Sequence, residues 1–512
     1  MATTKASAGD FSQSAWAHLL YLSVLAALVA AVPVGALDAM DRHAILAIGI
    51  IGTWRYGWNL FHFVRALIYQ RIVFPRMAAR AVAIASETPP RAIFLVTSFR
   101  IDAHTTSQVY RAVFAAALAH DGPSTIIASV VEMGDQRIVK QLFSRIVGGA
   151  RGDIRLVLVR IAGTGKRDAL AFGFRAIRAS VPEVDENDIV MVIDGDSMVP
   201  SDIVARCAPL LRLDPKIGAL TTDEMSELRE GRRIFHHWYS MRFAQRQIYM
   251  SSMGLAKRVL TLTGRMSMFR ATLVCDPDFI RQVEVDTIDH WRIGRYRLLT
   301  GDDKSTWFWL LRNGYKMVYV PDLIVHTVEV PPQPDFIPAS LQLMTRWFGN
   351  MLRTSSRAIA LGPGRIGLFT WWSLIDQRLS MWTSLTGLTF AVLTSITYTP
   401  WAMVVYAAWI MASRYLIMLL LLSQRREVSA WYPLLLIYNQ IVGSLVKIYA
   451  LTHPDRQRWT RQKTTFASSH GRGRALAISL TSHAANILSL LALVTAVGVW
   501  VGTFPIPFAL RF

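Results

Sequence analysis

The feature that most constrains this chain is a set of long apolar segments on both sides of a more polar middle part. Five of them have the length of a bilayer-spanning helix, which needs about 20 residues to cross roughly 30 Å of hydrocarbon. They are residues 15–37, 44–69, 379–398, 401–422 and 475–501. Charged residues make up 18% of the chain, against about 25% in soluble domains. The sequence therefore predicts a multi-pass membrane protein.

Basic residues beside the apolar segments indicate which loops face the cytoplasm. The second segment is followed by Arg71, Arg76 and Arg80. The positive-inside rule then places the N-terminus and the middle part in the cytoplasm, with the first loop outside. A further apolar stretch, residues 431–450, has basic residues on both sides. We expect it to be re-entrant or to lie at the membrane surface, followed by a basic loop at 452–474.

The formal net charge of +20 does not indicate nucleic-acid binding, because the basic residues are interleaved with apolar segments instead of gathered on a polar domain. Cytoplasmic loops explain part of the excess, and attraction of anionic ligands is a second explanation that composition does not separate from the first. Cys207 and Cys275 are the only cysteines. They fit neither a disulfide framework nor a zinc site, so a reducing cytoplasm suits the middle part.

The middle part, residues 81–335, has the pattern of an α/β domain. Short apolar runs predict buried parallel strands at 92–97, 125–131, 154–160, 189–193 and 318–320, with helices such as 107–119 and 169–179 between them. This alternation predicts a doubly wound sheet that holds ligands at the carboxyl ends of its strands. Two N-terminal spans (1–80) would precede it. Interfacial amphipathic helices (336–378) and a C-terminal membrane region (379–512) would follow.

Two acidic pairs carry the clearest signs of chemistry. Asp194 and Asp196 flank one glycine directly after a predicted strand, and such carboxylates suit a divalent cation shared with a diphosphate. Asp302 and Asp303 open a predicted helix, where one carboxylate would act as a general base. The alternatives are a solvated acidic turn for the first pair and helix capping for the second.

A glycine-rich turn, GTGKRD at residues 163–168, lies between a predicted strand and a predicted helix. Its cations Lys166 and Arg167 suit a phosphate group at a helix N-terminus, although the spacing is not that of a P-loop. Three further arginines, Arg55, Arg378 and Arg414, lie in or beside apolar segments. Ionisable groups there often line a polar path through the membrane, and snorkelling to the surface is the alternative.

These motifs resemble those of the family 2 processive synthases, which include the cellulose and hyaluronan synthases. The resemblance rests on the Asp-x-Asp and Gly-Asp-Asp motifs, Arg346-Trp347 on a predicted interfacial helix, the segment Thr263-Gly264-Arg265, and Trp459-Thr460-Arg461. Longer stretches, such as VTSFRID at 96–102 and DQRLSMWTSL at 376–385, are most similar to the alginate synthases.

This resemblance implies a glycosyltransferase-A fold and an enzyme of the bacterial inner membrane whose catalytic domain is cytoplasmic. It implies inverting polymerisation of mannuronate from GDP-mannuronate into β-1,4-linked polymannuronate, with Mg²⁺ or Mn²⁺ as cofactor. The implied partners are a membrane copolymerase subunit with a PilZ domain that binds cyclic di-GMP, other alginate secretion proteins and the lipid bilayer, but no nucleic acid. Processive synthesis of another polysaccharide, a glucan or a hyaluronan- or chitin-like chain, is the alternative.

The resemblance also assigns roles by position. Asp303 matches the base, with Asp302 beside it, and Asp194 and Asp196 match the metal and diphosphate motif. The nucleotide-sugar set is Thr97, Asp102, Glu132, Asp135, Lys166, Arg167, Asp194, Arg346, Trp459 and Arg461. The acceptor and polymer set is Trp347, Thr263, Gly264, Arg265 and Arg378. This sequence departs from the family pattern at Leu343, where the family has a glutamine, so the role of that glutamine does not carry over.

Overall fold

The apolar runs of the middle part form one eight-stranded sheet in the order β3-β2-β1-β4-β7-β6-β10-β5. The computed structural model describes residues 11–38, 42–84, 88–181, 183–228, 231–425, 428–457 and 471–504. The strands are β1 (Ala92–Thr97), β2 (Ser124–Val130), β3 (Ile154–Arg160), β4 (Ile189–Asp194), β5 (Ser197–Met198), β6 (Ile217–Leu228), β7 (Met266–Arg270) and β10 (Lys316–Glu329). Two further strands, β8 (Thr287–His290) and β9 (Gly294–Arg297), pair as a separate hairpin.

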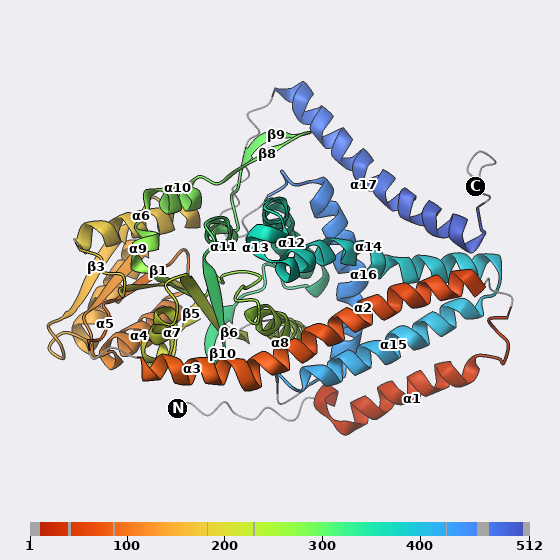
Figure 1. The fold of residues 1–512 in the computed structure, drawn as a ribbon, viewed down its shortest axis with the longest axis horizontal. Helices are drawn as coiled ribbons and strands as arrows, with labels where there is room; N and C mark the ends of the chain where they lie inside the picture. The colour runs from red at the N-terminus through yellow and green to blue at the C-terminus, as the bar shows by residue number, and fades with distance from the viewer. Residues whose placement is uncertain are drawn as a thin grey trace.

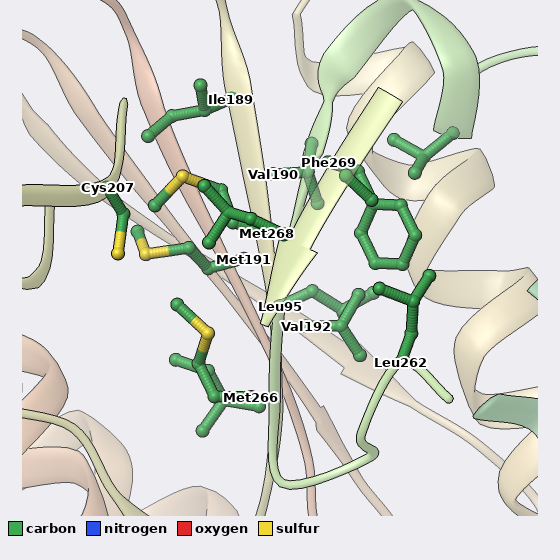
Figure 2. Packing of buried hydrophobic residues seen from close by; sticks show 14 of the residues in the cluster. Leu95, Ile189, Val190, Met191, Val192, Cys207, Leu262, Met266, Met268 and Phe269 are labelled. Carbon is green, nitrogen blue, oxygen red and sulfur yellow. The ribbon is translucent and has the colours of Figure 1, made fainter. Parts of the chain in front are cut away.

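The sheet is mixed, which corrects the expectation of a parallel sheet. Strands β1 to β4 pair in parallel as predicted, but β7 runs antiparallel to both β4 and β6. Strand β7 lacks an alternating pattern because Met266, Met268 and Phe269 are all buried between its neighbours. Figure 2 shows Met266 and Met268 on the same side of the sheet as Met191 of β4 and Cys207 of a covering helix, and Phe269 on the opposite side with Val190 and Val192. A strand covered on both faces has no polar side to mark it.

Helices cover both faces of this sheet, which is why its central strands are apolar throughout. The helices of the sheet domain are α4 (Ala103–Ala119), α5 (Met133–Ile146), α6 (Lys166–Ser180), α7 (Ile203–Arg212), α8 (Arg233–Gly254), α9 (Ala271–Val274), α10 (Pro277–Glu284) and α11 (Asp302–Arg312). Burying each large apolar side chain in this core contributes about 1.5–3 kcal/mol. The core therefore holds the strand ends that carry the polar motifs in place.

Long helices form the other end of the molecule (Figure 1). They are α1 (Ala15–Ala31), α2 (Arg42–Ile68), α12 (Phe336–Ala360), α14 (Leu368–Thr397), α15 (Trp401–Leu421), α16 (Trp431–Thr452) and α17 (Arg472–Val501), with the short α13 (Pro363–Ile366) before α14. A π-helical turn, Tyr69–Val73, joins α2 to α3 (Phe74–Ala83), which extends to the sheet domain. Helix α8 lies where the two ends meet, against α2, α16 and β6.

Among the described residues, four helices are long and apolar enough to cross a membrane: α14, α15, α16 and residues Gly473–Val501 of α17. The chain is therefore membrane-associated. Helix α14 begins at Leu368, before the expected span at 379. The stretch expected to be re-entrant or to lie at the membrane surface is one continuous helix, α16. The number of crossings and the side on which each loop lies stay predictions.

Candidate active site

Asp194 and Asp196 lie at the carboxyl edge of the sheet. Asp194 ends β4 and pairs in register with Thr97, the last residue of β1. Between the two carboxylates, a Cβ added at Gly195 would lie 2.9 Å from the carbonyl oxygen of Thr97 and 2.6 Å from the hydroxyl of Ser98. Only glycine therefore lets the chain turn this close to β1.

Lys166 joins the two acidic motifs. Its amine lies 2.5 Å from the carboxylate of Asp194 and 3.3 Å from that of Asp302. Lys166 opens α6 after the glycine-rich turn, and Asp302 opens α11 after Gly301, whose φ is 81°. A Cβ added at Gly264 would lie 2.6 Å from the same amine and 3.0 Å from Asp194. Lys166 and Asp302 are 136 residues apart in the sequence, and their motifs meet at the amine of Lys166.

Burial and charges in this cluster give the neighbouring carboxylates different pKa values. Burial raises the pKa of Asp194, and the carboxylates of Asp196 and Asp302 raise it further, while Lys166 opposes them. Burial acts on Asp302 too, but the amine of Lys166 holds its pKa below the ordinary value. Burial and the charge of Asp302 raise the pKa of Asp303. Asp302 is thus the ion-pair partner, and Asp303 is the better proton acceptor near neutral pH.

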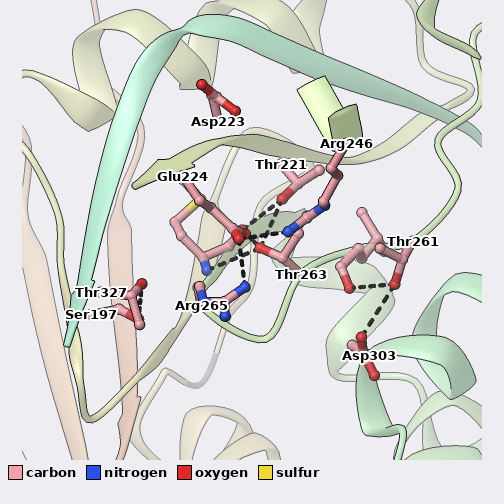
Figure 3. Close-up of polar contacts among 12 residues, drawn as sticks. Ser197, Thr221, Asp223, Glu224, Arg246, Thr261, Thr263, Arg265, Asp303 and Thr327 are labelled. Carbon is pink, nitrogen blue, oxygen red and sulfur yellow. Dashed lines mark hydrogen bonds and ion pairs between the residues drawn. The ribbon is translucent and has the colours of Figure 1, made fainter. Parts of the chain in front are cut away.

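Asp303 accepts a hydrogen bond from the hydroxyl of Thr261, at 3.2 Å (Figure 3). Lys304, the next residue, donates to the carbonyl oxygen of Leu260 at 2.7 Å, and burial lowers the pKa of Lys304 to about 8. The first turn of α11 is therefore tied to the 260–265 segment, which also carries the predicted acceptor residues.

Sequence analysis missed Glu224, a buried carboxylate of β6 that holds this segment. Arg246 and Arg265 lie 2.5 and 2.6 Å from its carboxylate (Figure 3). Arg265 also pairs with Glu329. Burial opposes ionisation, but the two arginines hold the pKa of Glu224 below its ordinary value. Thr263 donates to the carbonyl oxygen of Met266 at 3.1 Å. The available signal was the acidic pair at 223–224, which follows the apolar start of the run at 217–220.

The predicted nucleoside residues lie at the same edge of the sheet as Asp194. Thr97 ends β1, and Asp102 caps α4 by accepting from the backbone N–H of Thr105 at 2.9 Å. Glu132 and Asp135 lie at the start of α5, directly after β2. The Oγ1 atom of Thr97 is buried without a hydrogen-bond partner among the described residues, so it is available to a ligand at this edge.

Arg167 has a different environment from Lys166. It is buried, and its guanidinium donates to the carbonyl oxygens of Val283 and Thr300 at 2.8 and 3.0 Å, and to the hydroxyl of Ser305 at 3.0 Å. These contacts place Arg167 behind the loop that carries Asp302, where it supports that loop.

Helix α12 carries Arg346 and Trp347. The ring of Trp347 stacks on Trp238 of α8, with centroids 5.6 Å apart. Arg378 of α14 donates to the carbonyl oxygen of Leu352 at 2.6 Å and to the hydroxyl of Ser356, so it fastens α14 to α12. Leu343 is buried. The predicted donor-site residues Trp459 and Arg461 lie outside the described residues.

The carboxylate ligands at this site fit a divalent cation that also binds a substrate. No group of three or more His, Cys, Asp or Glu side chains converges within the described ranges, and Asp194 and Asp196 supply two carboxylates. A hard cation such as Mg²⁺ commonly takes one or two protein carboxylates and fills its remaining positions with substrate phosphates and water. The same oxygen ligands suit Mn²⁺.

Comparison with known proteins gives the family. A model described as glycosyltransferase like family 2 matches residues 89–350. The chain is 47% identical over 447 residues to glycosyltransferase alg8 of Pseudomonas syringae pv. tomato (strain ATCC BAA-871 / DC3000), and 47% identical over 448 residues to glycosyltransferase alg8 of Azotobacter vinelandii. Each match covers 87% of this chain and 90% of the relative. The chain belongs to this family of glycosyltransferases.

The family 2 glycosyltransferase domain at 89–350 coincides with the sheet domain and reaches into α12. Family membership confirms the expected enzyme class and the expected resemblance to the alginate synthases, and the expected α/β domain joined to membrane helices is confirmed. An N-acetylglucosaminyltransferase of Rhizobium meliloti (strain 1021) is 23% identical over 295 residues, which are 54% of this chain and 64% of that protein.

Among solved structures, the mannosyltransferase PcManGT from Pyrobaculum calidifontis, in complex with GDP-Man and Mn²⁺, aligns with a TM-score of 0.41 at 17% identity. The alignment covers 78% of this chain and 97% of that one.

Proposed function

We propose that this glycosyltransferase polymerises mannuronate from GDP-mannuronate into β-1,4-linked polymannuronate, the precursor of alginate, and passes the polymer across the bacterial inner membrane. The observation that supports this most directly is the meeting of Asp194, Asp302 and Lys166 at the carboxyl edge of the sheet. It combines a cation site, a diphosphate-binding amine and a neighbouring base, which are the parts that a sugar transfer from a nucleotide diphosphate requires.

On the donor side, the edge formed by β1, β2 and β4 would hold GDP. The predicted donor contacts are Thr97, Asp102, Glu132 and Asp135 for the nucleoside, and Lys166, Arg346 and Arg461 for the diphosphate, with Trp459 closing over the donor. Asp194 and Asp196 would hold Mg²⁺ or Mn²⁺, which when bound stabilises the negative charge of a departing diphosphate. Arg167 would act indirectly, by supporting the loop before α11.

On the acceptor side, Asp303 would take the proton of the attacking sugar hydroxyl. That oxygen then forms a bond to C1 of the donor mannuronate while the bond from C1 to the diphosphate oxygen breaks. The configuration inverts, and GDP and a polymer one sugar longer are released. The raised pKa of Asp303 supports its assignment as the base over Asp302, whose carboxylate is paired with Lys166.

The acceptor chain would lie along Thr263, Gly264 and Arg265 and against Trp347. Arg378 would lie beside the path by which the polymer leaves. The resemblance to alginate synthases further supports a membrane copolymerase with a cyclic di-GMP-binding PilZ domain, and other alginate secretion proteins, as partners. We place the catalytic domain in the cytoplasm because basic residues flank the apolar segments on the side of this domain, and the positive-inside rule assigns such flanks to the cytoplasm.

A donor screen tests the product. Membranes that contain the chain, with and without the copolymerase and cyclic di-GMP, would be supplied with GDP-mannuronate, GDP-mannose, UDP-glucose or UDP-N-acetylglucosamine. We expect alginate-lyase-sensitive polymer from GDP-mannuronate alone. Polymer from a neutral donor, with none from GDP-mannuronate, would instead establish the alternative polysaccharide.

The metal assignment predicts that EDTA abolishes synthesis and that Mg²⁺ or Mn²⁺ restores it, because two carboxylates alone bind such a cation weakly without nucleotide. Asp196→Asn should lose polymer synthesis by at least about a hundredfold while the protein still inserts and folds. Asp202→Asn, whose carboxylate lies on the exposed side of the same domain, is the matched control and should retain activity. Full synthesis by Asp196→Asn would remove the metal site from this motif.

A further inference from the structure

Two cations beside Phe348 form no ion pair with any described residue. Arg242 of α8 and Lys447 of α16 both lie over the ring of Phe348 on α12, with their charged groups 5.7 and 4.9 Å from its centroid. Within the described part of the chain, neither side chain forms an ion pair or a hydrogen bond. Helix α16 packs against both α8 and α12, and Trp238 of α8 stacks on Trp347 of α12, so the two cations lie where three helices meet.

Aromatic rings surround Arg242 on the side of the proposed acceptor path. Its guanidinium lies 5.0 Å from the ring of Trp238 and 4.7 Å from that of Trp347. Such cation–π contacts offset part of the loss of hydration but supply no counter-ion. Arg242, Lys447, Trp347 and Phe348 are all half-buried. Their exposed parts therefore remain accessible to a solute that enters between the helices.

Two other arginines of the helical end, Arg55 and Arg414, have partners, which makes this pair different from them. Arg55 pairs with Asp376 at 2.6 Å, and Arg414 donates to the amide oxygen of Gln440 at 2.9 Å. Buried charges are normally paired because an uncompensated charge out of water is unfavourable. The carboxylate of Asp376 acts on Lys447 only from a distance and is itself paired with Arg55. Two like charges that share one ring, with no ion pair among the described residues, therefore indicate an anion that comes from outside the chain.

Tyr239 offers an independent sign of a ligand. Its side chain is 1% exposed, and its hydroxyl has no hydrogen-bond partner among the described residues. It lies one turn before Arg242 on α8, with its ring edge against Trp347 at 6.2 Å. On the next residue of α8 after Arg242, the ring of Phe243 lies 4.8 Å from the guanidinium of Arg265. Helix α8 thus connects the proposed acceptor segment to the pair of cations.

We propose that Arg242 and Lys447 form a carboxylate-binding site for the sugars just behind the reacting end of the growing polymer, and that this site selects a uronate chain over a neutral one. The inference rests on the proposed function, because polymannuronate carries one carboxylate on every sugar. The hydroxyl of Tyr239 adds a donor for the same sugar, and the rings of Trp238, Trp347 and Phe348 form the walls.

Binding of defined oligosaccharides tests this site. The full chain in lipid nanodiscs would be titrated with mannuronate hexamers and with the same hexamers after reduction of their carboxyl groups to alcohols. The wild-type chain should bind the uronate hexamer about tenfold to a hundredfold more tightly, as expected for charge-assisted hydrogen bonds. The double variant Arg242→Met and Lys447→Met should bind both hexamers alike, and added salt should weaken only the wild-type preference.

Conservative and distant substitutions separate charge from packing. Lys447→Arg and Arg242→Lys keep the charges and should keep most of the preference. Arg281→Met removes an exposed arginine of α10 and should change nothing. GDP binding by every variant serves as the folding control. If the methionine double variant keeps the wild-type preference, or if it weakens both hexamers equally, the two cations only clamp the helices together and the proposal is wrong.

A polymer synthesis assay distinguishes failure of this inference from failure of the proposed function. A wild-type chain that makes no polymer from GDP-mannuronate overturns the proposed function. A wild-type chain that makes polymannuronate, but whose preference for uronate hexamers does not depend on Arg242 and Lys447, overturns this site alone.

Discussion

Asp302 and Asp303 are adjacent in the chain and differ in environment. Asp302 faces the amine of Lys166, whereas Asp303 accepts from the hydroxyl of Thr261. Both lie in the first turn of α11, where the helix dipole favours negative charge. One carboxylate is therefore stabilised as an ion, and the pKa of the other is raised by burial and by its neighbour. Asp302 is therefore suited to balance the charge of Lys166, and Asp303 is suited to accept a proton.

A pH profile tests this division. If Asp303 is the base, turnover requires its ionised form, so the rate should fall as the pH falls through its pKa. Because that pKa is raised, the fall should occur above the ordinary aspartate value of about 3.9. Donor binding should persist across the same range, since a base acts mainly in the transition state.

Substitution at the two aspartates completes the test. Asp303→Asn should lower turnover by about a hundredfold or more and leave GDP affinity nearly intact. A dead Asp302→Asn variant beside an active Asp303→Asn variant would reverse the assignment.

Among the structural elements, the long helices are joined by a few polar contacts inside an apolar bundle. Arg55 of α2 pairs with Asp376 of α14, and Arg378, two residues on, fastens α14 to α12. Neighbouring charged residues on α14 therefore contact different helices. This arrangement sets the position of α12, and with it the position of Trp347 relative to the sheet domain.

Removing one partner of the Arg55–Asp376 pair should destabilise the bundle. The two side chains are 18% and 6% exposed, so Asp376→Ala leaves a half-buried arginine uncompensated, at a cost of up to about 3–5 kcal/mol. The matched control is Asp335→Ala, which breaks an ion pair with Arg232 whose side chains are 62% and 70% exposed. That change should cost about 1 kcal/mol or less. Thermal unfolding in a defined detergent measures both, and equal shifts would contradict a structural role for the buried pair.

Across the whole molecule, the sheet domain and the long helices meet at a tight contact. The hydroxyl of Tyr69, in the π-helical turn after α2, donates to the carbonyl oxygen of Tyr319 in β10 at 2.6 Å. Gly254 at the end of α8 leaves room for this ring, since an added Cβ would lie 2.6 Å from it. Through this contact, the orientation of α2 is coupled to the strand next to β6 and to the site beyond it.

Gly254→Ala should disturb that contact. A methyl group there would displace the buried ring of Tyr69, and overpacking of this kind costs about 1–3 kcal/mol. Gly134→Ala on α5 is the matched control, because an added Cβ there meets nothing within 4 Å. The expected result is a lower unfolding temperature and reduced polymer synthesis for Gly254→Ala alone. Identical behaviour of the two variants would show that the contact does not couple the two ends.

Local patterns in the sequence were enough to predict several parts of this protein. Apolar runs predicted β1 to β4 because strands covered on both faces carry few polar residues. Segment length predicted α14, α15 and α17 as candidate spans because hydrocarbon thickness sets the length of an apolar helix. The acidic motifs at 194–196 and 302–303 were recognisable because their spacing is local, and they lie together in the structure as the family resemblance implied.

Other features depended on contacts between distant parts of the chain, and only the tertiary structure decided them. The position of β7 between β4 and β6 needs the whole sheet, because a strand buried on both faces has no alternating pattern. The pairing of Glu224 with Arg246 and Arg265 needs β6, α8 and the 263–265 segment to fold together. Arg242 and Lys447 lie on helices far apart in sequence, and no periodicity of 2 or 3.6 residues links them. Helix packing decides which charges find partners, and here it leaves these two cations to share one ring.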